Sequence, residues 1–291
     1  MFENFIAYLR FEKRFSEHTV VAYENDLKQF AEFLAFKTES ESYEVKSATI
    51  RSWIVEMMNS GLKSKSVNRK IASLRTYYRW LRKEGIMNSS PMQKIQGPKN
   101  EKRLPVFAKE ADLVTQKLEG IFANTFEGVR DELMFELFYQ TGIRLSELIE
   151  LKEKDFGQTQ IKVLGKRNKE RIIPISQNLC FKINAYLILK HKEIGETIQL
   201  FILPNGNKLY SVLVYRKINY YLGLTTSLDK KSPHILRHTF ATHMLNNGSG
   251  LETLKDLLGH ANLSATQIYT HNSFAKLNAI YSQAHPRGHN K

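Results

Sequence analysis

Gly-His-Ala-Asn-Leu-Ser-Ala-Thr-Gln-Ile-Tyr-Thr-His, residues 259–271, carries the most specific pattern in this chain. Upstream of it lie Pro-His-Ile-Leu-Arg-His-Thr-Phe-Ala-Thr-His at residues 233–243 and Thr-Gly-Ile-Arg-Leu-Ser-Glu-Leu at residues 141–148. The polar residues of interest in these stretches are, in chain order, Arg144, His234, Arg237, His260 and Tyr269. Two arginines, two histidines and a tyrosine in this order predict a site that attacks a phosphodiester without a metal ion.

Attack on a phosphodiester requires cations, because its non-bridging oxygens repel a nucleophile and negative charge accumulates in the transition state. Arg144 and Arg237 suit this role, since a guanidinium stays charged and presents a planar fork to phosphate oxygens. Arg144 follows the turn expected at Gly142, where a helix begins and backbone amides favour anions. Glu147 shares its helix face, and we expect it to hold Arg144 in a surface ion pair, to orient it, or to do both.

The phenol of Tyr269 is the candidate nucleophile, although the chain has thirteen tyrosines. Its free pKa of about 10 keeps it protonated, so nearby cations or a base must help to remove the proton. His260 lies nine residues earlier, and a turn and a short helix would bring the two together. His234 lies three residues before Arg237 and therefore shares its helix face.

A basic loop, Gly-Lys-Arg-Asn-Lys-Glu at residues 165–170, separates two stretches that alternate as strands, residues 160–164 and 171–175. A lysine in this hairpin can reach a groove and protonate a leaving oxygen. Chemistry alone does not choose Lys166 over Lys169. The other basic residues of the hairpin are expected to contact phosphates: Arg167, Lys169 and Arg171.

The sequence predicts no metal ion and no other cofactor. His234 and His238 have a spacing that suits zinc, but no adjacent glutamate or third ligand completes a site. Gly165-Lys166 lacks the earlier glycine and the following Ser/Thr of a P-loop, and no GxGxxG occurs. A lone histidine is more often structural than catalytic, so we interpret His238 and His243 as structural.

The net charge of +14 is concentrated in one segment. Residues 46–103 contain fourteen Lys/Arg and three Asp/Glu, whereas residues 1–45 contain five Lys/Arg and nine Asp/Glu. A charge that served only solubility would be spread evenly. The distribution therefore favours a nucleic-acid partner.

The remaining composition points to a soluble cytoplasmic protein. Cys180 is the only cysteine, which fits a reducing cytosol. Charged residues interrupt the apolar residues near the N-terminus, so no secretory signal is visible. No run of eighteen apolar residues occurs, so no membrane span is expected.

The first part of the chain predicts a domain of four helices. Ser16 is the expected N-cap of the second helix, and Gly61 and Gly85 are expected to end the third and fourth. Apolar residues recur at helical spacing in four stretches: residues 2–9, 20–34, 50–57 and 67–81.

The fourth of these helices is strongly basic on one side. Arg75, Arg79 and Arg82 share a face, and no acidic residue occurs between residues 62 and 83. A solvated helix normally interleaves acids to gain favourable pairs, so charge left uncompensated here indicates that phosphates compensate it. We hypothesise that this helix lies against DNA. The expected DNA contacts of the chain are Lys65, Arg69, Arg75, Arg79, Arg167 and Lys169.

Composition also predicts the domain boundaries. Residues 88–105 contain three prolines, Gly97 and several lysines, which is typical of a linker, and thirteen extended residues reach about 40 Å. Such a linker would let two domains grip opposite sides of a duplex. We expect a DNA-binding domain over 1–87, a catalytic domain over 106–272 and a final helix and tail over 273–291.

The catalytic domain is expected to be mostly helical with a small β-sheet, so the whole chain is mainly α. Residues 128–139 are apolar nearly all round, which indicates a central helix. The other helices are expected over residues 110–118, 144–151, 177–190, 211–221, 234–246, 251–257, 264–270 and 273–284.

Taken together, these motifs resemble the tyrosine recombinases of the phage integrase family, of the bacterial Xer type. The catalytic stretches that carry the resemblance are residues 141–148, 165–171, 234–245, 257–260 and 269–271. Three further stretches match, at residues 16–27, 68–75 and 281–287, so the resemblance runs almost end to end. It implies a SAM-like four-helix DNA-binding domain before the catalytic domain.

The resemblance also implies a role for each residue. Tyr269 would form a 3′-phosphotyrosyl bond and free a 5′-hydroxyl, while Arg144 and Arg237 would hold the scissile phosphate. His234 and His260 would assist proton transfer and hydrogen-bond the phosphate. By resemblance alone, the proton donor to the leaving oxygen would be Lys166. The family often has glycine after this lysine, where Arg167 stands here.

The resemblance implies a DNA-bound tetramer, homomeric or with a paralogous recombinase, that passes through a Holliday junction and exchanges its C-terminal helices between protomers. A DNA translocase is a possible further partner. The expected task is resolution of chromosome dimers in the cytoplasm, at the nucleoid. The alternatives are an integrase of a mobile element and a non-catalytic DNA-binding protein. The short N-terminus favours the chromosomal role, and the complete catalytic set argues against a protein that only binds.

Overall fold

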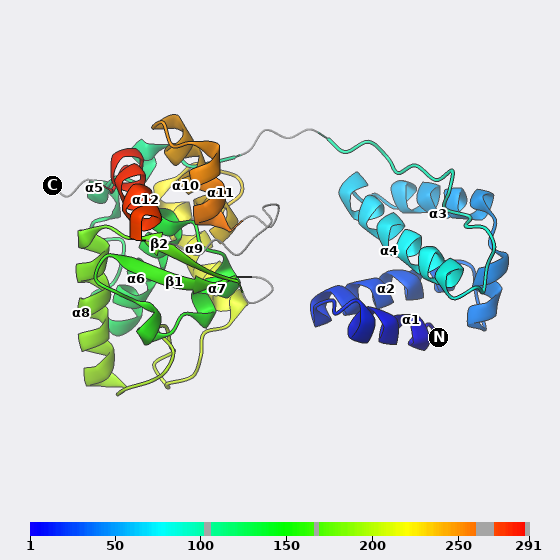
Figure 1. The fold of residues 1–291 in the computed structure, drawn as a ribbon, viewed down its shortest axis with the longest axis horizontal. Coiled ribbons are helices and arrows are strands. Elements are labelled where there is room, and N and C mark those ends of the chain that lie inside the picture. The colour runs from blue at the N-terminus through cyan, green and yellow to red at the C-terminus, as the bar shows by residue number, and fades with distance from the viewer. Residues whose placement is uncertain (102–105, 166–168, 260–270, 289–291) are drawn as a thin grey trace. The chain divides into compact units, whose positions relative to one another are not determined.

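The computed structural model describes residues 1–101, 106–165, 169–259 and 271–288. The chain divides into two compact units, residues 1–103 and 104–291, each with its own hydrophobic core (Figure 1). Both are mainly helical, as the sequence predicts. Within the described ranges, no helix is long and apolar enough to cross a membrane.

Helices build the N-terminal unit around aromatic and aliphatic side chains. They are α1 (Glu3–Ala7), the π-helical η1 (Tyr8–Glu12), α2 (Glu17–Phe33), the 3-10 helix η2 (Glu39–Glu44), α3 (Ser47–Asn59) and α4 (Ser64–Lys83). Ser16 is the N-cap of α2 as expected, but its hydroxyl pairs with Thr19 Oγ1 at 2.9 Å. Gly61 and Gly85 follow α3 and α4 with positive φ angles, in line with the sequence prediction.

The first half of the expected linker packs onto this unit. Met92 and Ile95 are buried in its core, and Ser47 Oγ donates to Pro91 O at 2.6 Å. Asn68 Nδ2 donates to Pro98 O at 2.8 Å. Gly97 permits this contact, because a Cβ there would lie 1.7 Å from Asn68 Oδ1. Residues 91–98 therefore belong structurally to the N-terminal unit.

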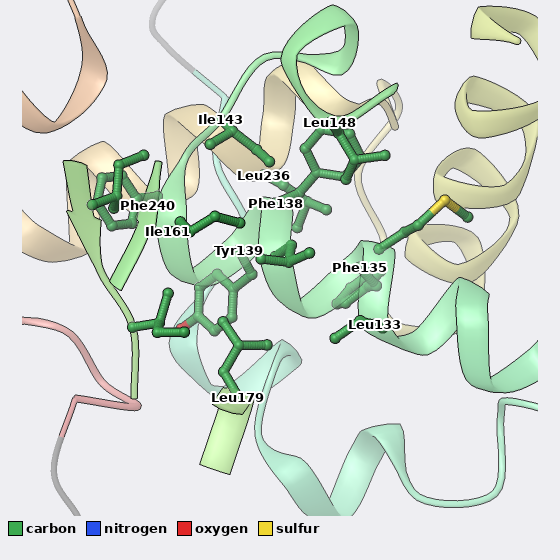
Figure 2. Packing of buried hydrophobic residues seen from close by; sticks show 14 of the residues in the cluster. Leu133, Phe135, Phe138, Tyr139, Ile143, Leu148, Ile161, Leu179, Leu236 and Phe240 are labelled. Carbon is green, nitrogen blue, oxygen red and sulfur yellow. The ribbon is translucent and has the colours of Figure 1, made fainter. Parts of the chain in front are cut away.

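Helix α6 (Phe126–Thr141) is the centre of the C-terminal unit, as its apolar sequence predicts. Thirteen of its residues are buried, and it packs against α8 (Gln177–Glu193) and α10 (Pro233–Asn246). Figure 2 shows its aromatic residues Phe135, Phe138 and Tyr139 among side chains from neighbouring elements. Further helices of this unit are α7 (Leu145–Glu150), η4 (Glu153–Asp155), α9 (Ser211–Thr225), α11 (Leu251–Leu258) and α12 (His271–Ala284).

The predicted hairpin is present. Strand β1 (Gln160–Leu164) pairs antiparallel with β2 (Glu170–Pro174), and Ile161 faces Ile173 in the register. At the loop, Gly165 N donates to Lys169 O at 2.8 Å. The sequence alternation therefore placed both strands within one residue of their positions.

The prediction of one helix over 110–118 is wrong. The segment forms a 3-10 turn, η3 (Glu110–Asp112), and a short helix, α5 (Thr115–Leu118). Val114 has an extended backbone between them, and the side chain of Leu113 is buried in the core. Burial of Leu113 overrides the helical propensity of the stretch.

Helix α12 packs on its own unit in this single chain. It contacts α10 and β2, and Leu277, Tyr281 and Ala284 are buried in the core. After the helix, His285 Nε2 donates to Tyr139 O at 3.2 Å, and Arg287 forms an ion pair with Glu136.

Candidate active site

A glycine turn positions Arg144 at the start of α7. Gly142 ends α6 with φ +60°, and a Cβ there would lie 2.5 Å from Phe240 and 2.9 Å from Leu258. Arg144 then adopts an extended backbone as the N-cap of α7. Only glycine adopts this backbone angle and fits this space, so the turn fixes the position of Arg144 at the start of α7.

Glu147 is buried and holds two arginines, so the expectation of a surface ion pair is wrong. It accepts from Arg144 N at 2.8 Å and from Arg144 Nη1 at 2.7 Å. It also accepts from Arg171 Nη1 at 3.0 Å and Nη2 at 2.8 Å. Burial alone would raise the pKa of this carboxyl, but the hydrogen bonds and charges of Arg171 and Arg144 lower it to about 2.

Arg171 itself is buried, which corrects the expectation that it contacts phosphate. It is 5% exposed and faces into the unit from the first residues of β2. The strand period places it on the same face as Ile173 and Ile175, which are also buried. This alternation is the sequence signal that could have identified an inward-facing arginine.

Arg237 projects from α10 and is 9% exposed. Its Nη1 donates to Gly142 O at 2.5 Å and its Nη2 to Leu258 O at 2.8 Å. Burial, followed by the charges of Arg144 and Arg171, lowers its pKa to about 10, so it remains charged at neutral pH. Arg144 Nη2 donates to the next carbonyl, Gly259 O, at 3.1 Å. The two arginines expected to hold phosphate are therefore anchored on adjacent residues.

His234 belongs to the same cluster. It lies one turn before Arg237 on α10 and is exposed. Partial burial of its ring, and then the charges of His238, Arg237 and Arg144, lower its pKa. The lowered pKa favours the neutral imidazole, which can accept or donate a hydrogen bond.

The structural interpretation of His243 is confirmed, because it lies buried between Tyr139 OH at 3.2 Å and Ala108 O at 3.0 Å. His238 is exposed, and its charge contributes to the lowered pKa of His234.

Four expected site residues lie outside the described part of the chain: Lys166, Arg167, His260 and Tyr269. Their neighbours are described. Lys169 is exposed at the hairpin, and Gly259 ends α11 with φ +63° directly before His260.

The basic face of α4 is partly compensated, contrary to expectation. The guanidinium of Arg69 forms an ion pair with Asp26 of α2, and Lys70 Nζ donates to the same carboxylate at 3.0 Å. Arg75 is exposed but donates to Ile95 O at 3.0 Å. Lys65 and Arg79 are exposed and have no ion pair among the described residues. No local sequence signal pointed to Asp26, because it lies more than forty residues from its partners.

Comparisons with known proteins show the family of the chain. Residues 112–276 match the phage integrase family, and residues 2–85 match the phage integrase N-terminal SAM-like domain. Tyrosine recombinase XerC of Staphylococcus haemolyticus is 40% identical, over 97% of this chain and 96% of the relative. Tyrosine recombinase XerC of Chlorobaculum tepidum is 35% identical, over 97% and 93%.

Solved structures share the fold. A XerH site-specific recombinase bound to a palindromic difH substrate aligns with a TM-score of 0.72 at 21% identity, covering 91% of this chain and 79% of that one. A lambda integrase bound to DNA aligns with a TM-score of 0.67 at 20% identity, covering 91% and 92%. With its SAM-like and catalytic units both matched and curated relatives similar over nearly their full length, this chain belongs to the phage integrase family and is a tyrosine recombinase, an enzyme that cuts and rejoins DNA.

Proposed function

We propose that the chain performs site-specific recombination through a 3′-phosphotyrosyl link between DNA and Tyr269. One observation carries this proposal: Arg237 and Arg144 donate to the adjacent carbonyls Leu258 O and Gly259 O, directly before His260. Each guanidinium has five N–H donors, and the described contacts leave several for the non-bridging oxygens of a phosphate.

In the proposed step, the phenolic oxygen of Tyr269 attacks phosphorus as the bond from phosphorus to the 5′-oxygen breaks. Lys166 gives a proton to the leaving 5′-oxygen, and His260 and His234 assist transfer of the phenolic proton. Arg144 and Arg237 stabilise the charge on the non-bridging oxygens. Because one phosphoester replaces another, a 5′-hydroxyl of a second strand can attack the link and religate without ATP.

The same chemistry, performed by four protomers on two DNA sites, exchanges one pair of strands into a Holliday junction and then the other pair. Full-length similarity to proteins named tyrosine recombinase XerC supports resolution of chromosome dimers as the cellular task, in preference to integration of a mobile element. We infer that the protein acts in the cytoplasm at the nucleoid, with a paralogous recombinase and a DNA translocase as candidate partners.

Exchange of the C-terminal helix between protomers is part of this proposal. The face of α12 that packs on its own unit carries Leu277 and Tyr281, and Arg287 follows it to pair with Glu136. The same surfaces exist on every protomer, so a neighbouring unit offers α12 an identical set of contacts.

We also propose that α4 contacts DNA. Lys65 and Arg79 are exposed and have no described carboxylate partner, so phosphates can take that place. Charge reversal of Lys65 or of Arg79, one at a time, is expected to lower affinity for duplex DNA and to reduce its dependence on salt. Lys37→Glu, an equal charge change at an exposed position outside α4, is the control. If the α4 variants and Lys37→Glu lost the same amount of affinity for DNA, contact between α4 and DNA would be contradicted.

The cleavage chemistry is tested with a nicked duplex made from DNA that the protein binds in cells. Cleavage next to the nick releases a short strand, so the covalent protein–DNA product is trapped. We expect wild type to form this product and Tyr269→Phe to form none, because the phenylalanine ring has no nucleophile. Absence of a product from wild type across the bound sites would favour a protein that only binds DNA.

A further inference from the structure

Arg171 lies behind the proposed phosphate site and makes its contacts inside the C-terminal unit. Its two Nη atoms donate to Glu147 Oε1 at 3.0 Å and Oε2 at 2.8 Å. Its Nε donates to Leu257 O at 2.8 Å. One planar group thus ties β2 to the first turn of α7 and to the last turn of α11.

Three successive carbonyls at the end of α11 each accept a hydrogen bond from a different arginine. Leu257 O accepts from Arg171, Leu258 O from Arg237, and Gly259 O from Arg144. Carbonyls in the last turn of a helix lack a partner within the helix, and this end carries the negative pole of the helix dipole. The end of α11 therefore acts as a common anchor for three guanidinium groups.

Gly259 makes room for this arrangement. A Cβ at this position would lie 3.2 Å from Arg171 Cδ and 3.3 Å from Arg171 Nη1. Its φ of +63° turns the backbone so that its carbonyl is available to Arg144. The glycine and the arginine are thus matched to each other in space.

Glu147 connects the same groups by charge. Both Arg171 and Arg144 donate to its Oε1 atom, at 3.0 Å and 2.7 Å. If Arg171 were lost, this carboxylate would keep Arg144 but lose the contact that fixes its own orientation. The end of α11 would lose one of its three anchors in the same step.

We propose that Arg171 is a positioning residue of the cleavage reaction, which holds Glu147 and the end of α11 and thereby fixes Arg144 and Arg237 relative to the scissile phosphate. This inference rests on the proposed phosphate-binding role of those two arginines. Without Arg171 both charges remain, but their positions are less fixed. Affinity for the duplex should be retained. The cleavage rate should fall, because the transition state is less well stabilised.

The test compares Arg171→Met and Arg171→Lys with a matched control, Arg130→Met. Arg130 is also buried, pairs with Asp131 at 2.8 Å and donates to Ile202 O at 3.2 Å, but it belongs to none of the proposed site. Thermal unfolding, duplex affinity and the single-turnover rate of covalent product formation are measured for each full-length protein at saturating protein concentration.

We expect Arg171→Met to slow covalent product formation by about 10- to 100-fold, as loss of an orienting contact does elsewhere, with duplex affinity within about threefold of wild type. Arg171→Lys keeps the charge but cannot span the carboxylate and the carbonyl together, so about a tenfold loss is expected. Arg130→Met should lose stability without this selective loss of rate. If Arg171→Met does not fold, the same comparison is made with Arg171→Lys.

A neutral substrate separates positioning from a general loss of structure. A methylphosphonate at the scissile position replaces one charged oxygen by a methyl group, so it depends less on the placement of the two guanidiniums. On this substrate, the Arg171 variants should form the covalent product less than about threefold more slowly than wild type. An equal deficit on both substrates, a wild-type rate for Arg171→Lys, or the same pattern in Arg130→Met would overturn the proposal. Failure of wild type to form the covalent product would instead count against the proposed function.

Discussion

Glu147 sets the charge balance at the centre of the proposed site. It is a buried carboxylate held by two arginines, and its pKa is lowered to about 2. A buried charge pair is weak evidence for stability, but breaking one by removing a single partner is strongly destabilising. The carboxylate therefore links the stability of the unit to the position of Arg144.

The stability that Glu147 contributes should depend on pH. Because the pKa of Glu147 is lower in the folded state than its unfolded value near 4.3, its stabilisation is present above that value and is lost as pH falls towards 2. Glu147→Gln should reduce the free energy of unfolding at pH 7 by on the order of 3 kcal/mol. Urea unfolding from pH 7 to pH 2.5 should show this difference shrinking below about pH 5.

Glu170→Gln is the control for this experiment, because Glu170 is an exposed residue paired with Lys162 at 3.5 Å. Its effect should stay within about 0.5 kcal/mol. A Glu147→Gln effect that does not vary with pH would show that the ionised carboxylate is not the source of the stability.

At the residue scale, the sequence predicted Arg144, Arg237 and His234 through their spacing, and the structure brings these three into one cluster. It did not predict that Glu147 would be buried, because burial depends on β2, which comes from a distant part of the chain. Arg171 was misjudged because a basic loop suggested phosphate contact, whereas the strand period placed it inward.

At the scale of elements, the C-terminal end of α11 determines the geometry of the site. Helix ends carry unpaired carbonyls, and here arginine side chains satisfy them in place of water or a cap. The glycine at this end is therefore required for a contact as well as for a backbone angle.

Gly259→Ala tests this requirement. An alanine at φ +63° costs about 1–2 kcal/mol of stability and also presses on Arg171, so covalent product formation should slow by about tenfold or more. Gly248→Ala is the control, because Gly248 has φ +87° and open space around its Cβ position. It should lose similar stability without slowing the reaction. Equal rates for the two variants would contradict the role of α11.

Local patterns predicted the elements well where one face or the whole surface is apolar. The alternation in β1 and β2 and the apolar surface of α6 are examples. The break between η3 and α5 was missed because it results from burial of Leu113 in the tertiary core, which the local sequence does not show. The pairing of Asp26 with α4 was missed for the same reason, since it forms only when α2 and α4 pack together.

At the scale of the whole molecule, the chain forms two compact units. Part of the segment that joins them packs onto the N-terminal unit. Met92 and Ile95 are core residues of the N-terminal unit, although composition had suggested a free linker. Proline and glycine content identified the region but did not show that its few apolar residues would be buried.

Exchange of α12 is tested by reversing the ion pair of Arg287 and Glu136. Arg287→Glu and Glu136→Arg each place like charges together, so each variant alone should assemble poorly on DNA. A mixture should recover assembly if tails are exchanged, because every tail then meets an opposite charge on its neighbour. Recovery is measured as junction formation, and a mixture no better than either variant alone would contradict exchange.

In the proposed reaction, fixed cations enable the oxygen of Tyr269 to break a DNA strand unaided by metal. It is tested most directly by mapping the trapped product in chelator: after digestion with nuclease and protease, mass spectrometry identifies the residue that carries the nucleotide, and end-labelling identifies the released strand. We expect a 3′-nucleotide on Tyr269 and a free 5′-hydroxyl on the other strand end. A nucleotide on any other residue, or a 5′-phosphate on the released end, would contradict it.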